Sequence, residues 1–374
     1  MLKVSIIGIG NAGNQVAELA KKTKNIPGLA INSSSKDIST LTSVDKMVVG
    51  DEKGAGKDRS IAKDFMRKNI ENLIKKENVK SLIENSDVVF IVSSTGGGTG
   101  SGQSPVFCNI LTKLFPSIKF ILVNVFPPLK ESVAAQQNTI EYLKEMVSFN
   151  PTYMSYDNNR FASLAVKEMM EKVNEEIVED ICIIRGDYQY NTPYNSIDEK
   201  DMLKIVSTPG RLAIAKAYGF KEKDLDETSI EEILIEQIKS KSAMVEIEKD
   251  GIVKRMGVIS NLPEKMTSKF DNNIQKVKEY TGEPIEGFEH VFVNKKEEPN
   301  KVLVLMSGLS IPDDRIEKIN DRVEEAKEKI SRVKESSLLE STDVGFLEDL
   351  RNTTEEEPST TQIDIGSIFE QFGL

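Results

Sequence analysis

The feature of this sequence that most constrains its fold is a glycine-rich stretch that follows a short apolar run. The apolar run covers residues 88–92, and residues 93–102 read SSTGGGTGSG. Residues 103–115 are expected to form a helix, so the stretch lies at a strand-to-helix turn. Glycine has no Cβ, so amide groups here can approach an anion closely, and the helix N-terminus adds positive partial charge. The sequence predicts a phosphate site at this turn; a flexible linker is disfavoured, because linkers seldom lie between a buried strand and a helix.

The heptapeptide GGGTGSG, residues 96–102, resembles the signature loop of the tubulin/FtsZ superfamily of polymerising GTPases. In that family the loop wraps the phosphates of the guanine nucleotide. The resemblance therefore implies GTP or GDP as the ligand, with Mg²⁺ bridging its phosphates. The residues that it assigns to phosphate binding are Gly96, Gly97, Gly98, Thr99, Gly100 and Ser101.

A second glycine motif, the first loop, stands near the start of the chain. Residues 3–7 are expected to form a strand, residues 8–14 read GIGNAGN, and a helix ending near Lys24 follows. The G-x-G-x-x-G pattern is typical of nicotinamide-dependent enzymes, but that fold carries an acid at the end of the second strand, where this chain has Asn32. The resemblance implies instead that the first loop and the second strand hold the same guanine nucleotide, through Gly10, Asn11, Gly13, Asn14 and Asn32.

A third loop, residues 54–59, reads GAGKDR. It is not a Walker A motif, because Asp51 and Asp58 stand where that motif requires a glycine and a Ser or Thr. The family has a loop at this place that senses the γ-phosphate, so the resemblance assigns that contact to Gly54, Ala55 and Gly56. A plain surface turn is the alternative.

The resemblance also places residues around the ribose and the base. Residues 120–126 read as a buried strand of a parallel sheet, and Glu131 follows as the ribose candidate, although Ala135 stands where FtsZ proteins usually have an arginine. Asn158 and Asn174 are the candidates for the guanine edge, since an amide both donates and accepts hydrogen bonds. Asn174 begins a long helix with an apolar stripe, and a solvated asparagine is the alternative there.

The candidate catalytic acids lie further on, where residues 194–201 read YNSIDEKD. Locally, Asp198 is expected to be a helix N-cap. By resemblance this segment is the family's catalytic loop, whose acids reach the nucleotide of the next subunit. Asp198 is the first choice and Asp201 the second.

Composition excludes several other kinds of site. The chain has one histidine, His290, and two distant cysteines, Cys108 and Cys182, so multi-histidine zinc sites and Ser-His or Cys-His catalysis lack parts, and no protein metal site is predicted. We expect both thiols to be buried and reduced.

No basic stripe is present, which argues against direct binding to nucleic acid. No run reaches the length of a membrane span and no signal peptide is evident, so we expect a cytoplasmic protein without membrane contact.

The second half of the chain is expected to form a smaller α+β domain. Helices are predicted over residues 211–218 and 229–239, and strand-like runs over residues 243–247, 256–259, 290–293 and 302–306. A charged surface helix is expected over residues 311–335. Residues 336–374 hold nine acids and one arginine, a net charge of −8 out of −11, and are expected to be a disordered tail whose apolar end, residues 363–374, docks on a partner.

The predicted fold class is α/β, a Rossmann-like parallel-sheet GTPase domain joined by a long central helix to the α+β domain. The expected boundaries are 1–168 for the GTP-binding domain, 169–194 for the central helix, 195–310 for the polymer-contact domain, 311–335 for the surface helix and 336–374 for the tail. The chain resembles most the plasmid- and phage-borne TubZ group, which implies a homopolymer that segregates DNA through a DNA-binding adaptor held by the tail. Alternatives are an FtsZ-like division filament, a relative that binds nucleotide without hydrolysis, and a nicotinamide-dependent enzyme.

Overall fold

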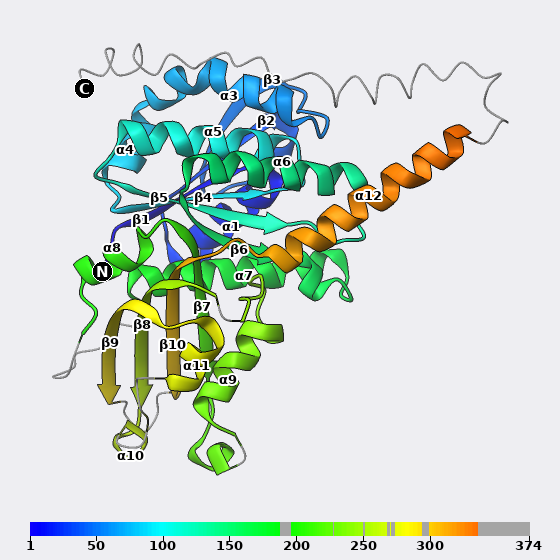
Figure 1. The fold of residues 1–374 in the computed structure, drawn as a ribbon. Coiled ribbons are helices and arrows are strands. Elements are labelled where there is room, and N and C mark those ends of the chain that lie inside the picture. The colour runs from blue at the N-terminus through cyan, green and yellow to red at the C-terminus, as the bar shows by residue number, and fades with distance from the viewer. Residues whose placement is uncertain are drawn as a thin grey trace.

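A computed structural model describes residues 1–187, 196–226, 228–249, 251–267, 270, 274–293 and 299–335. One ten-stranded sheet runs through the molecule in the order β3-β2-β1-β4-β5-β6-β7-β10-β8-β9 (Figure 1). Its first six strands are β1 Val4–Ile9, β2 Gly28–Ser34, β3 Asp45–Glu52, β4 Val88–Ser94, β5 Lys119–Phe126 and β6 Thr152–Asp157. These six pair in parallel, as expected for strands that alternate with helices.

Helices cover both faces of the parallel part of the sheet. The helices are α1 Gly10–Lys24, α2 Ser35–Ile38, α3 Arg59–Ile74, α4 Glu77–Glu84, α5 Thr99–Leu114, α6 Val133–Phe149 and α7 Val166–Arg185. On β1, Ile6 joins a core with residues of α1 and α7, while its neighbour Ile7 joins a separate core with residues of α3, α5 and α6. Because successive side chains of a strand point to opposite faces, α1 and α7 lie on one face and α3 to α6 on the other.

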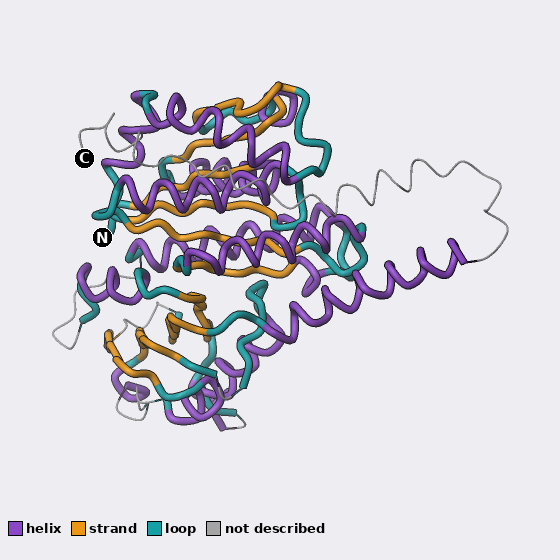
Figure 2. Tube along the Cα trace, turned by 45° about the horizontal axis from the view of Figure 1, so that its top comes forward, coloured by secondary structure: helices purple, strands orange, loops and turns teal. Residues whose placement is uncertain are grey.

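The second half of the sheet is antiparallel around β10. Its strands are β7 Gly210–Tyr218, β8 Val253–Leu262, β9 Pro284–Val293 and β10 Lys301–Leu309. It meets the first half through two residue pairs between β6 and β7, Thr152 with Gly210 and Tyr153 with Arg211. Figure 2 shows this smaller part turned away from the plane of the parallel strands. The remaining short elements are η1 Asn158–Phe161, α8 Glu199–Val206, η2 Glu222–Asp226, α9 Ile230–Glu236, the π-helix η3 Gln237–Lys241, α10 Glu264–Thr267 and α11 Gln275–Thr281.

Two predictions for this second part are wrong. Residues 211–218 form strand β7 and not a helix. Leu212 to Ala217 are all buried, the charged Lys216 included, and so short a buried run has no period that separates the two states. Residues 243–247 are not a strand; only Met244 makes an isolated bridge, to Tyr156 of β6. The runs at 256–259, 290–293 and 302–306 lie within β8, β9 and β10, as predicted.

The central helix α7 begins three residues before its predicted start. Its stripe Val173, Ile177, Ile181 and Ile184 is fully buried, and Gly186 ends it in the left-handed region at φ 97°. The predicted continuation to residue 194 passes into residues 188–195, which lie outside the described residues, as does the tail 336–374.

The helix α12, Asp313–Glu335, packs against the body of the protein at one end. Ile319 and Val323 are buried where its first half packs beside α6, so the predicted surface helix has one buried face in this half. Its far half projects away from the body (Figure 1). Across the described part of the chain, no helix is long and apolar enough to cross a membrane.

Candidate functional site

The candidate site lies between two neighbouring strands whose following helices pack on opposite faces of the sheet. Strands β1 and β4 are neighbours, but α1 leaves β1 toward one face of the sheet and α5 leaves β4 toward the other. Such a switch opens a crevice at the carboxyl ends of the two strands, which is where open parallel sheets bind ligands. The first loop and the signature loop both lie at this crevice, because each follows one of the two strands.

The first loop and the signature loop touch through their backbones. Gly10 has φ +74°, and a Cβ on it would lie 3.0 Å from the amide nitrogen of Gly100. A Cβ on Gly13 would lie 1.9 Å from the carbonyl oxygen of Val92, at the end of β4. No other residue fits at these two positions without moving the backbone. The structure therefore brings together the two glycine loops that the sequence placed 90 residues apart.

The loop at residues 54–59, here called the sensor loop, packs against the signature loop. A Cβ on Gly98 would lie 2.8 Å from Cα of Lys57. Asp58 then caps α3, since its Oδ1 accepts hydrogen bonds from the amides of Ser60 at 2.7 Å and Ile61 at 3.2 Å. Gly54, Ala55 and Gly56 thus lie on the segment that borders the predicted phosphate site.

Buried polar groups at the crevice lack partners in the protein. Asn14 is 1% exposed, and among the described residues neither its amide nitrogen nor its amide oxygen is hydrogen-bonded. Asn32 is also 1% exposed, and its side-chain nitrogen Nδ2 has no hydrogen-bond partner among the described residues. Leaving such groups unpaired costs about 1–3 kcal/mol each. A polar ligand in the crevice would satisfy them, so the residues present fit a nucleotide.

The start of α5 supplies further donors. The amides of its first turn, Thr99, Gly100 and Ser101, have no acceptor within the helix and point along its axis into the crevice. The hydroxyl of Thr99 is bonded to that of Ser33 in β2 at 2.6 Å, and the hydroxyl of Ser101 donates to the carbonyl of Gly97. The Ser101 hydroxyl therefore holds the loop, and its backbone amide is the group directed at the ligand.

The predicted ribose and base contacts lie at the ends of β5 and β6. Glu131 is exposed in the turn before α6, which Ser132 caps, and Asn158 is half-buried in η1 directly after β6. The neighbouring Asn159 accepts a hydrogen bond from the amide of Leu129 at 3.1 Å, which ties the two turns together. Asn174 is half-buried on α7, a helix that contacts η1. Asn11 is exposed at the first turn of α1.

The candidate catalytic acids lie at the opposite end of the sheet. The amino terminus of Met1 forms an ion pair with Glu199 of α8 at 2.6 Å, so α8 lies beside the amino end of β1, while Gly10 follows its carboxyl end (Figure 1). Six residues of strand separate the two ends, about 20 Å. Asp198 and Asp201 therefore do not share a crevice with the glycine loops of the same chain.

Asp198 and Asp201 form a capping box at the start of α8. The carboxylate of Asp198 accepts from the amide of Asp201 at 2.8 Å, and that of Asp201 accepts from the amide of Asp198 at 3.5 Å. Just before them, the amide of Ile197 donates to Nδ1 of His290 at 3.0 Å, which gives that histidine a structural role. Asp198 stays exposed despite its capping role.

Arg59 is a residue beside the candidate site that the sequence did not single out. Its side chain is 6% exposed, and its Nη2 donates to the carbonyl of Ser101 at 3.0 Å and to Glu145 of α6 at 2.9 Å. It thereby joins the end of the sensor loop to the first turn of α5. An arginine next to a glycine loop is the only sequence signal that could have indicated this.

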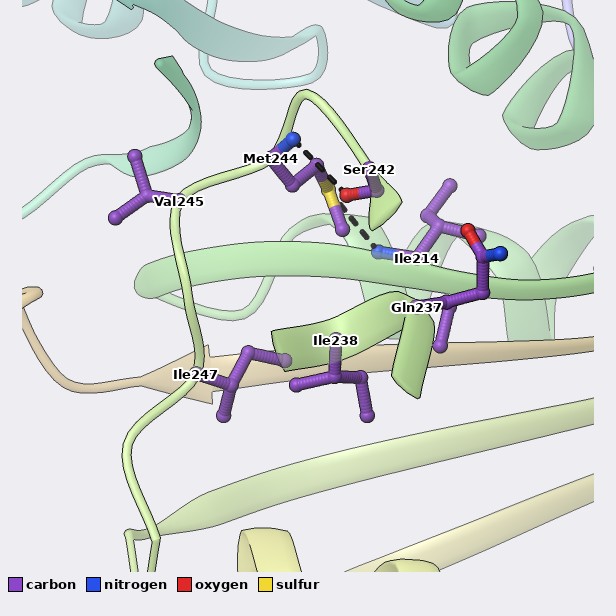
Figure 3. Close-up of a pocket in the computed structure, with 8 residues that line it drawn as sticks. Ile214, Gln237, Ile238, Ser242, Met244, Val245 and Ile247 are labelled. Carbon is purple, nitrogen blue, oxygen red and sulfur yellow. Dashed lines mark hydrogen bonds between the residues drawn. The ribbon is translucent and has the colours of Figure 1, made fainter. Parts of the chain in front are cut away.

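Figure 3 shows a small pocket away from the crevice, between β7, η3 and residues 242–247. Mostly apolar side chains line it, together with Gln237 and Ser242. The amide of Met244 donates to the hydroxyl of Ser242 at 3.0 Å, and the amide of Ile214 lies 3.4 Å from the Met244 sulfur. Without a charged group it offers nothing to a phosphate. Among the described residues no cluster of three or more His, Cys, Asp or Glu could hold a metal ion. The prediction that both cysteines are free and buried is confirmed.

Comparisons with known proteins agree with this geometry. Residues 3–166 match the GTPase domain of the tubulin/FtsZ family. The chain is 23% identical over 323 residues to the tubulin-like protein CetZ of Pyrococcus horikoshii. This match covers 82% of this chain and 86% of the relative. It is 24% identical over 242 residues to the cell division protein FtsZ 1 of Pyrococcus furiosus, and this match covers 61% of each chain.

The fold is similar to that of TubZ from Bacillus thuringiensis serovar israelensis, solved as a GTPγS-form protofilament. The TM-score is 0.72 at 20% identity, and the match covers 89% of this chain and 93% of that one. The predicted α/β fold is thereby confirmed. The family match favours a guanine nucleotide over the nicotinamide alternative.

Proposed function

Because residues 3–166 match the GTPase domain of the tubulin/FtsZ family, we propose that this protein is a filament-forming GTPase whose active site is completed by the next subunit. One observation carries the proposal: the glycine loops and the acids Asp198 and Asp201 lie at opposite ends of the same sheet. An enzyme with its phosphate site at one end and its acids at the other hydrolyses GTP only when two copies meet end to end.

Within one subunit, the residues at the crevice would hold GTP. The amides of the signature loop and of the α5 N-terminus would bind the phosphates, Asn14 and Asn32 would pair with the nucleotide through their free amides, and Asn158 and Asn174 would read the base. The sensor loop would report the γ-phosphate. Bound Mg²⁺ would supply neutralisation of the charge that develops on the phosphates.

The acids of the neighbour would complete the reaction. Head-to-tail stacking places α8 of one copy over the crevice of the next, and such an interface repeats into an open filament. Asp198, or Asp201 behind it, would then orient the attacking water toward the γ-phosphate. Hydrolysis would follow assembly and would weaken the interface behind it.

We further propose that the filament segregates or positions plasmid or phage DNA in the cytoplasm, in the manner of the TubZ group. The similarity to a TubZ protofilament supports this reading, and the apolar end of the acidic tail, residues 363–374, is the proposed contact for a DNA-bound adaptor. The sequence similarity to FtsZ 1 keeps a division filament as the second candidate. Deleting residues 363–374 would spare assembly and weaken adaptor binding under the first reading.

The first experiment measures phosphate release from GTP and Mg²⁺ over a series of protein concentrations, beside light scattering of the same samples. We expect both signals to rise above one threshold concentration. If phosphate release is proportional to the protein concentration from the lowest concentration upward, and no light scattering appears, then one subunit holds the whole site. Nucleotide binding with no release at any concentration would identify a non-hydrolysing relative.

A mixing experiment tests the shared site directly. Asp198→Asn keeps a helix N-cap but lacks the acid, and Gly97→Asp puts a negative charge where the phosphates would bind, in a position whose Cβ meets nothing within 4 Å. Each variant alone should be inactive. Their mixture should recover part of the activity, because the intact crevice of one meets the intact acid of the other; an inactive mixture that still co-sediments would refute the shared site.

A further inference from the structure

We propose that Asn138 of α6 is a positioning residue that couples the sensor loop to the signature loop and so sets the preference for a triphosphate. The inference rests on the proposed function, because it concerns how the same crevice tells GTP from GDP. Asn138 is 8% exposed and does not face the solvent side of α6. Nothing in its sequence context distinguishes it from any other amide on a helix.

One amide group of Asn138 serves both loops. Its Nδ2 donates to the carbonyl of Lys57 at 3.0 Å, to that of Gly96 at 3.2 Å and to that of Gly97 at 3.4 Å. The first acceptor is in the sensor loop, and the other two are in the signature loop. The two N–H groups of this amide are shared among three carbonyls. A movement of one carbonyl therefore changes the strength of the hydrogen bonds to the other two.

These bonds orient the amides that face the crevice. In a planar trans peptide, the N–H of one residue points opposite to the C=O of the residue before it. Holding the carbonyls of Gly96 and Gly97 against Asn138 therefore turns the amides of Gly97 and Gly98 away from α6. In the described part of the chain these two amides have no acceptor, and converging free amides form an anion-binding concavity.

The neighbouring residue of α6 holds the loop from its other side. The hydroxyl of Thr139 is bonded to that of Thr95 at 3.0 Å, and Thr95 precedes the signature loop. The α6 helix thus fixes the start of the loop through Thr139 and its glycines through Asn138. The sensor loop is the part of this arrangement that a γ-phosphate would contact. Its position reaches Gly96 and Gly97 through the Asn138 amide.

The test compares Asn138→Leu with Gln137→Leu in the full chain. Leucine has the same number of side-chain heavy atoms as asparagine and removes the donor without adding charge. Gln137 is the matched control, because it is the preceding residue of the same helix and, within the described ranges, its amide bonds only the side chain of Glu141, at 3.0 Å. The measurement is the dissociation constants of GTPγS and GDP, by displacement of a fluorescent guanine nucleotide, beside thermal unfolding of each variant.

We expect Asn138→Leu to weaken GTPγS binding about tenfold and GDP binding clearly less, and Gln137→Leu to change neither. An unchanged ratio of the two constants in Asn138→Leu would overturn the inference. If the wild type itself binds no guanine nucleotide, the proposed function fails instead. If Asn138→Leu does not fold, Asn138→Ser, which keeps one donor, should show a smaller shift of the ratio in the same direction, and no shift would count against the coupling.

Discussion

The guanidinium of Arg315 and the carboxylate of Asp157 form a buried two-point ion pair that ties α12 to the carboxyl end of β6. The Nε–Oδ2 distance is 2.6 Å and the Nη2–Oδ1 distance is 3.0 Å. Nη2 also donates to the carbonyl of Pro127, at the end of β5, at 2.8 Å. The base of α12 is thus bonded to both turns that carry the proposed ribose and base contacts.

Arg315→Ala should destabilise the protein strongly. It leaves the Asp157 carboxylate, 5% exposed, without its counter-charge, and breaking a buried pair from one side costs about 3–5 kcal/mol. The control is Arg322→Ala on the same helix, whose ion pair with Glu325 is exposed and should be worth less than about 1 kcal/mol. Urea unfolding of both variants checks this, and equal midpoints would show that the buried pair contributes nothing.

Gly97→Ala and Gly98→Ala should separate ligand binding from folding. A Cβ on Gly97 meets nothing within 4 Å, so the variant should unfold like the wild type, yet its methyl group would enter the crevice and weaken GTPγS binding about tenfold. A Cβ on Gly98 meets the Lys57 backbone at 2.8 Å, so that variant should lose about 1–3 kcal/mol of stability as well. Wild-type affinity in Gly97→Ala would place the phosphates elsewhere.

Asp180 of α7 should make stability depend on pH. Its carboxylate is fully buried, accepting hydrogen bonds from Tyr156 at 2.7 Å and from Lys216 of β7 at 2.8 Å, and Glu176 and Glu179 also surround that lysine. Burial raises the pKa of Asp180 to about 7, against the opposing effect of Lys216. A carboxyl group with a raised folded pKa stabilises the fold fully below its unfolded pKa, and this contribution is lost as the pH rises to 7.

The measurement compares the wild type with Asp180→Asn by urea unfolding between pH 5 and pH 8. Asparagine keeps the size of the side chain and does not titrate; its Oδ1 can still accept from Lys216, and its Nδ2 can donate to the Tyr156 hydroxyl. We expect the wild type to lose stability relative to the variant by about 1.4 kcal/mol per pH unit up to pH 7, and little beyond. Parallel stability curves would mean that Asp180 is ionised across this range.

Asp198 should prove to have two separable roles. Asp198→Ala removes both the acid and the N-cap of α8, which costs about 1 kcal/mol of stability, whereas Asp198→Asn removes the acid alone. Both variants should lose phosphate release, and only the alanine variant should unfold earlier. Phosphate release that survives in Asp198→Asn would move the catalytic role to Asp201 or to another residue.

The glycine loops show how far sequence reasoning reaches. Local chemistry identified them, because only glycine permits the positive φ of Gly10 and the backbone approach at Gly13, and both are properties of a few consecutive residues. The same reasoning failed at β7, where a run of small and apolar residues carries no period. Asn138 gave no signal, since its partners are backbone carbonyls that only packing brings near. Arg59 stands next to a glycine loop, but its partners, the Ser101 carbonyl and Glu145, are likewise brought near only by packing.

The sequence by itself determined the alternation of strands and helices, the phosphate chemistry of the two glycine loops and the cap at Asp198, because each depends on residues close together in the chain. The tertiary structure decided that the loops meet at one crevice, that Arg315 reaches Asp157 across 158 residues, and that the acids lie at the far end of the sheet. These relationships arise from the order and direction of strands in the sheet, which depend on long-range packing and not on local pattern.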